Sequence, residues 1–209
     1  MTAKRASSSQ RDDDRRTVPT AQQRVLRRLR NLLPQRDEPI SWLEAEHLAA
    51  HQAMLLNRLA GGLDMDAADF ITSLPTIRLE LHDDLPIPHV SYWHPVSQRW
   101  IIALKLGLSS TDQRTAILHE FKRILDYGRT GSLYDARRPH GYVQAEMAAD
   151  YFTGCALMPG REVRVALRVD TSPTYVADTF HVSEELAIRR LSELGALTHH
   201  LPNLERREP

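Results

Sequence analysis

Hydrophobic and polar residues follow two different periods along this chain, and the periods predict helices toward both ends with strands between them. The first long stretch of helical spacing begins at a capping box formed by Ser41 and Glu44. It ends at the pair Gly61 and Gly62, because glycine favours the backbone geometry of a helix terminus. We therefore expect a helix over residues 42–62. Its apolar positions are Leu43, Leu48, Leu55, Leu56 and Leu59.

A second stretch of helical spacing lies ahead of Gly128. Ser110 and Gln113 have the S-x-x-Q form of a capping box, so we expect a helix to begin there and to stop before Gly128. Within this helix His119 and Arg123 are four residues apart and share a face, whereas the intervening Glu120 points roughly a quarter-turn away. The apolar stripe consists of Ala116, Ile117, Phe121, Ile124 and Leu125.

Residues 76–104 change to the period of a β-strand. Apolar and polar residues alternate over 77–81 and again over 90–94, and a dense apolar run follows over 100–104. Residues 95–98 predict a turn between the last two segments. The expected fold class is α+β, mainly helical, with a small antiparallel sheet of about three strands.

The C-terminal third returns to helical spacing. Residues 144–159 predict a buried helix that stops at Pro159. Later, Ser183 precedes two acidic residues and an amphipathic run that ends at Gly195, as expected for a capped helix. Two short helices joined by a tight turn indicate a helical hairpin of helix-turn-helix type.

Composition narrows the class of protein. The chain has 209 residues, of which 42% are hydrophobic and 26% charged, enough to build a core. A net charge of zero argues against a globally basic nucleic-acid binder. The single cysteine, Cys155, excludes an internal disulfide and suits a reducing compartment. No apolar run approaches a membrane span, and the polar first 20 residues lack the features of a signal peptide and predict disorder.

The chemistry of the chain centres on His119 and Glu120. In zinc peptidases the helical motif H-E-x-x-H supplies two metal-binding histidines one turn apart, and its glutamate activates the metal-bound water. This chain has the first histidine and the glutamate, but the position of the second histidine is Arg123. Arginine stays protonated and is a donor only, so it cannot be a zinc ligand.

A second motif supports this interpretation. Residues 144–159 read QAEMAADYFTGCALMP, with Glu146 near the start and Asp150 one turn later. Together the two segments resemble the ImmA/IrrE family of metallopeptidases, and the resemblance runs from about residue 76 to 197. In that family the glutamate of the second helix is the third zinc ligand, which maps to Glu146. The resemblance thus implies His119 and Glu146 as metal ligands and Glu120 as the catalytic base.

The loss of a histidine at position 123 leaves several outcomes open. The resemblance implies Zn²⁺ as the cofactor of an active protein, with His140 or Asp150 as substitute ligands, or else no cofactor at all. An ion pair between Arg123 and Glu146, Glu120 or both would replace the metal by a charge contact. We expect a degenerate zinc site.

The resemblance also implies the biological role. Family members act in the cytoplasm of bacteria, their phages or mobile elements, and relieve repression by cleaving or binding a helix-turn-helix repressor protein. The alternatives are a non-enzymatic antirepressor and a DNA-binding regulator. The second would use Arg189 and Arg190 of the C-terminal helices and the arginine-rich N-terminal arm.

These expectations divide the chain into five parts. Residues 1–20 form a disordered tail and 21–62 the N-terminal helices. Residues 63–160 form the zincin-like core, 161–198 the C-terminal helical hairpin and 199–209 a second tail.

Overall fold

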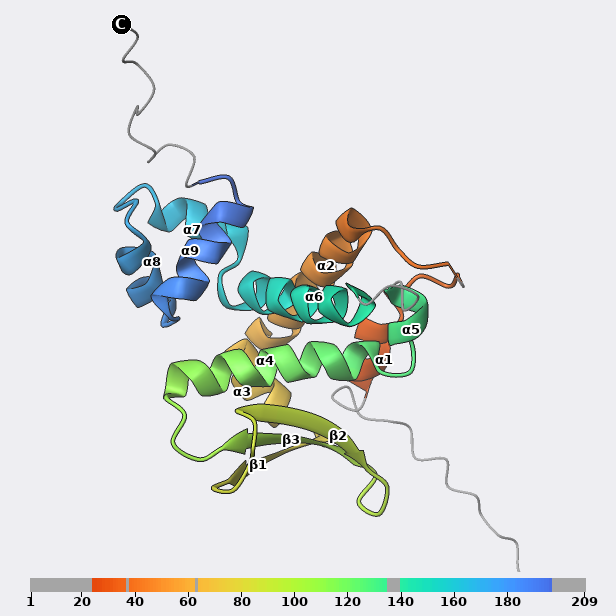
Figure 1. Cartoon of the computed structure of the whole chain (residues 1–209). Coiled ribbons are helices and arrows are strands. Elements are labelled where there is room, and N and C mark those ends of the chain that lie inside the picture. The colour runs from red at the N-terminus through yellow and green to blue at the C-terminus, as the bar shows by residue number, and fades with distance from the viewer. Residues whose placement is uncertain (1–23, 37, 63, 135–139, 197–209) are drawn as a thin grey trace, which may run out of the picture.

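The computed structural model describes residues 24–36, 38–62, 64–134 and 140–196 (Figure 1). The two predicted tails, 1–20 and 199–209, lie outside these ranges. In chain order the elements are α1 (Val25–Arg30), α2 (Trp42–Gly61), α3 (Ala67–Thr72), β1 (Ile77–His82), β2 (His89–His94), β3 (Arg99–Lys105), α4 (Ser110–Asp126), α5 (Thr130–Leu133), α6 (His140–Leu157), α7 (Gly160–Ala166), α8 (Pro173–Phe180) and α9 (Glu184–Glu193). The expected fold class, mainly helical α+β with a three-stranded sheet, is confirmed.

The sheet is mixed, with strand order β1-β3-β2. β2 and β3 form the expected antiparallel hairpin, in which His94 is paired with Arg99 across the predicted turn. β1, however, runs parallel to β3, with Ile77 opposite Trp100, so the expectation of a wholly antiparallel sheet was wrong for this pair. The reason is connectivity: β2 does not pair with β1 but occupies the far edge of β3. The central strand β3 is buried over 100–104, as its continuous apolar run requires.

The elements form layers around the longest described helices. α4 lies on one face of the sheet, α6 packs against α4, and α2 packs against α6 (Figure 1). The C-terminal helices α7, α8 and α9 gather near the C-terminal end of α6 (Figure 1). No helix of the described ranges is long and apolar enough to cross a membrane.

The helix termini follow the sequence signals, with one shift. The capping box of Ser41 and Glu44 is present at the start of α2. At α4 the N-cap is Ser109 rather than the expected Ser110, because Ser109 accepts the backbone N–H of Asp112 and donates to its carboxylate. Gly128, at φ +79°, follows the last turn of α4 as predicted.

The C-terminal hairpin has the predicted form. α8 ends at His181, which is in the left-handed region at φ +51°. The side chain of Ser183 then accepts the N–H of Leu186 and caps α9, and Gly195 follows α9 at φ +68°. Within the described residues, three helices follow Pro159: α7, α8 and α9.

An ion pair between Lys122 and Asp126 lies buried within the core. Lys122 is completely buried, and its Nζ donates to Asp126 Oδ1 at 2.7 Å. The Tyr134 hydroxyl donates to the other oxygen of Asp126, also at 2.7 Å. Burial lowers the pKa of Lys122, although the negative charge of Asp126 acts to raise it. Burial and the same carboxylate raise the pKa of Tyr134, so its proton stays in place to donate.

Candidate functional site

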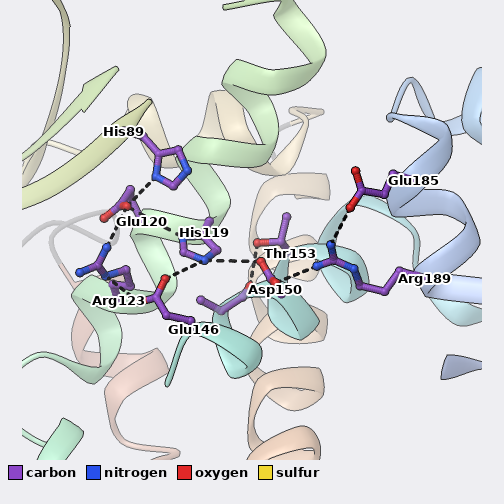
Figure 2. Close-up of polar contacts among 10 residues, drawn as sticks. His89, His119, Glu120, Arg123, Glu146, Asp150, Thr153, Glu185 and Arg189 are labelled. Carbon is purple, nitrogen blue, oxygen red and sulfur yellow. Dashed lines mark hydrogen bonds and ion pairs between the residues drawn. The ribbon is translucent and has the colours of Figure 1, made fainter. Parts of the chain in front are cut away.

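Two packed helices bring the predicted metal ligands together. His119 lies in α4, and Glu146 and Asp150 lie one turn apart in α6. His119 Nε2 is 3.6 Å from Glu146 Oε2 and 3.5 Å from Asp150 Oδ1 (Figure 2). The expected approach of His119 to Glu146 is confirmed. The side chain of His140, the other predicted substitute ligand, lies outside what the structure describes.

Arg123 carries a guanidinium into this space, and the expected ion pair is present. Its Nη1 donates to Glu120 Oε1 at 3.3 Å, and its Nε lies 3.6 Å from Glu146 Oε1. Arg123 therefore links α4 to α6 by charge, from the position where the motif has its second histidine (Figure 2).

Glu120 is fully buried and has partners on both oxygens. His89 Nδ1 donates to Oε1 at 2.7 Å, because an ionised carboxylate can only accept. The Ser91 hydroxyl donates to Oε2 at 2.6 Å. Burial alone would raise the pKa of Glu120, but the His119 and His89 rings, the Ser91 hydroxyl and the Arg123 charge outweigh it and lower that pKa. Glu120 is a stably ionised carboxylate.

Sequence reasoning missed His89 and Ser91. Both lie on β2, about 30 residues from Glu120, and neither belongs to the zinc motif. The alternation of side chains along a strand was the available signal. Because residues 90, 92 and 94 share one face, residues 89, 91 and 93 lie together on the opposite face. That face points at α4.

His89, His119 and Glu120 form a group that could hold a metal ion. Each offers a ligand atom, and these atoms all lie within 4.8 Å of one another. The two imidazole rings meet edge to face with centroids 5.2 Å apart. His119 Nδ1 is buried without a hydrogen-bond partner among the described residues, 3.8 Å from Glu120 Oε1.

Asp150 connects the site to the C-terminal hairpin. Its Oδ2 accepts from Arg189 of α9 at 2.7 Å, while Oδ1 faces His119. Arg189 also lies 3.4 Å from Glu185, one turn earlier in α9 (Figure 2). One oxygen of Asp150 is thus engaged by Arg189, and the other faces His119, where it could bind a metal ion.

A cavity of about 310 Å³ opens beside Arg123 and Glu146. Its aromatic wall comes from Trp100, Tyr127 and Tyr142, and Ser91 of β2 also lines it. Trp100 is buried and packs edge to face on Tyr127, with centroids 4.8 Å apart. The cavity is therefore lined by aromatic side chains on one side and by the charged pair Arg123 and Glu146 on the other.

Residues 76–192 match the peptidase M78 family, described as the IrrE N-terminal-like domain. The chain belongs to this family. No curated protein matches this IrrE-like chain in sequence. Its fold is similar to that of a Mycobacterium tuberculosis transcriptional regulator, with a TM-score of 0.54 and 19% identity over 80% of this chain and 51% of the other. The IrrE-like chain thus spans about half the length of that regulator, and the likeness shows the fold.

The residues of this IrrE-like chain do not fit a catalytic zinc bound as the family resemblance implies. Position 123 holds a permanent cation in place of a ligand. Glu146 and Asp150 both approach His119 Nε2. Among the described side chains, however, only the ligand atoms of His89, His119 and Glu120 all lie within 4.8 Å of one another. Each of the two carboxylates also faces an arginine.

Arg190, which the DNA-binding alternative would place on the surface, is buried. This side chain is only 5% exposed; its Nε donates to the Met158 carbonyl and its Nη1 to Glu193. It packs against the Tyr151 ring, 5.6 Å from its centroid. A buried, internally paired guanidinium cannot reach a phosphate, so the position serves packing. Arg189 is more exposed but is bound to Asp150.

Proposed function

We propose that this IrrE-like protein relieves repression by binding a helix-turn-helix repressor in the cleft between β2, α4 and α6, without cleaving it. The observation that carries the proposal is Arg123, which occupies the vacated ligand position and contacts both Glu120 and Glu146. The family supports the class of partner. The paired charges support the absence of cleavage.

The state of Glu120 argues further against peptidase chemistry. A general base needs a free lone pair directed at the water that it deprotonates, and a pKa near the working pH. Both oxygens of Glu120 already accept hydrogen bonds, and its pKa is lowered. The protein's own donors therefore already engage this carboxylate, which counts against the role of general base.

The surface around the cleft supports peptide binding. β2 is an edge strand among the described strands, so one side of its backbone is free to pair with an extended segment of a partner. Tyr92 and Trp93 of β2 are partly exposed, and Tyr127 and Tyr142 are exposed at the adjoining cavity. A repressor segment paired with β2 would place alternate side chains over that cavity.

The test is the Arg123→His variant beside the natural protein. The variant restores two histidines one turn apart, so it should gain zinc binding that depends on Glu146. Zinc stoichiometry would be measured in the variant and in Arg123→His/Glu146→Ala. Arg99→His, on the exposed end of β3, is the control for adding a histidine elsewhere.

The second measurement uses a helix-turn-helix repressor from the same source organism, with and without zinc. The natural protein should bind this repressor and leave it intact. Zinc-dependent cleavage by the natural protein, abolished by Glu120→Gln, would overturn the proposal.

A further inference from the structure

The two nitrogens of the His119 ring face two different sets of side chains. Nε2 faces Glu146 and Asp150, whereas Nδ1 faces Glu120 on the side of His89 (Figure 2). His119 is 8% exposed, and within the described residues its Nδ1 has no hydrogen-bond partner. A buried polar atom without a partner is unfavourable, so a species that binds Nδ1 is favoured there.

The spacing around Nδ1 is close to what a tetrahedral ion requires. Metal–ligand bonds of about 2.0–2.1 Å place ligand atoms roughly 3.3 Å apart. Glu120 Oε1 lies 2.7 Å from His89 Nδ1 and 3.8 Å from His119 Nδ1. Each of these two separations must change by only about half an ångström to match the tetrahedral value.

We propose that His89, His119 and Glu120 bind a divalent transition-metal ion such as Zn²⁺ on the Nδ1 side of His119, and that the ion fastens the edge strand β2 to helix α4. Two imidazoles and one carboxylate suit zinc better than magnesium or calcium, which prefer all-oxygen sites. On binding, the ion takes the place of the proton on His89 Nδ1, and the neutral ring then carries its proton on Nε2.

Neighbouring side chains define how the ion is accommodated. Ser91 keeps its hydrogen bond to Glu120 Oε2 and orients the carboxylate. Arg123, whose charge opposes a dication, turns from Glu120 toward Glu146, which already lies 3.6 Å from its Nε. Because Glu120 becomes a ligand, it is not free to act as a base, and the role of the ion is regulatory rather than catalytic.

The consequence for the cleft follows from the place of His89. It is the first residue of β2, the strand along which the proposed function seats the repressor segment. An ion that joins this residue to α4 holds the start of the strand, which lowers the ordering cost of partner binding. This regulatory role rests on the proposed function; the metal site itself does not.

The test is zinc binding by the full chain, measured by titration calorimetry with Zn²⁺ alone. The natural protein should bind about one ion per chain, and His89→Asn should weaken binding by at least the roughly 10- to 100-fold that loss of an outer-shell partner costs. Asparagine can still donate to Glu120, which protects the fold. His94→Asn, the same change at the other end of β2, is the matched control and should bind as the natural protein does.

Three further measurements separate the possible results. Glu146→Ala should keep zinc binding, and Co²⁺ should give the intense visible bands of a tetrahedral site in the natural protein but not in His89→Asn. Zinc should also slow amide exchange over β2 in the natural protein. Absence of zinc binding, or binding unaffected by His89→Asn, would overturn the inference. Loss of zinc binding in Glu146→Ala with retention in His89→Asn would point instead to the family's site and count against the proposed function as well.

Discussion

Helix α4 carries two groups of charged residues that differ in how completely they are paired. The core group is Lys122 and Asp126 with Tyr134, and the cleft group is His119, Glu120 and Arg123. In the core group every charged atom is buried, with partners at 2.7 Å. In the cleft group one imidazole nitrogen has no hydrogen-bond partner in the described structure, and Arg123 is partly exposed. Burial of charge alone therefore does not identify a functional site; the cleft group differs from the core group in its incomplete pairing and partial exposure.

The largest effect is expected from breaking the core group. Asp126→Asn removes the carboxylate that faces the completely buried Lys122. An uncompensated buried charge costs about 3–5 kcal/mol, so the free energy of unfolding should fall by that amount in urea denaturation. The double variant Lys122→Met/Asp126→Asn removes the orphaned charge and should recover most of the loss. A loss below about 1 kcal/mol in the single variant would contradict the structural role assigned to this pair.

A smaller, pH-dependent effect is expected in the cleft group. The folded-state pKa of Glu120 lies below its ordinary value, so its ionised form stabilises the fold above the unfolded pKa of about 4.3. That contribution is lost as the pH falls below the unfolded value toward the folded one. The natural protein should therefore lose its stability advantage over Glu120→Gln, by about 1 kcal/mol or more, between pH 6 and 3.

The control for this prediction is Glu38→Gln, at an exposed position. Its unfolding free energy should follow that of the natural protein across the same pH range. An equal pH dependence of the natural protein and Glu120→Gln would show that the cleft carboxylate is not held ionised by its partners.

The smallest effect is expected at the ion pair that joins α9 to the site. Arg189 and Asp150 are both partly exposed, at 41% and 46% of their side chains. Pairs of this kind contribute about 0–1 kcal/mol and weaken in salt. Arg189→Gln should accordingly change unfolding by less than about 1 kcal/mol. A loss near that of Asp126→Asn would mean that the hairpin is held by this contact rather than by its apolar packing.

The sequence predicted well where a signal is local. The capping residues Ser41 and Ser183, the apolar stripe of α4 and the glycine after it each depend on neighbours within one or two turns. The meeting of His119 with Glu146 was also predicted, because two whole motifs matched the family and their helices pack together.

Apart from the one-residue shift of the α4 N-cap from Ser110 to Ser109, the failures concern partners distant in sequence. Periodicity does not state which edge of β3 a strand joins, so the parallel β1 was missed. It gives no partner for a strand histidine, so His89 was missed. The burial of Arg190 depends on the Met158 carbonyl, 32 residues away, and polarity alone suggested a surface position.

Arg123 has a consequence for how readily this protein could change its dependence on metal. A histidine codon becomes an arginine codon by substitution of its middle base, and either side chain leaves α4 toward the same two carboxylates. The ion pair of Arg123 with Glu146 already joins α4 to α6 by a contact that needs no cation. A point mutation at position 123 can therefore exchange a charged contact for a residue able to bind metal, with the rest of the scaffold unchanged.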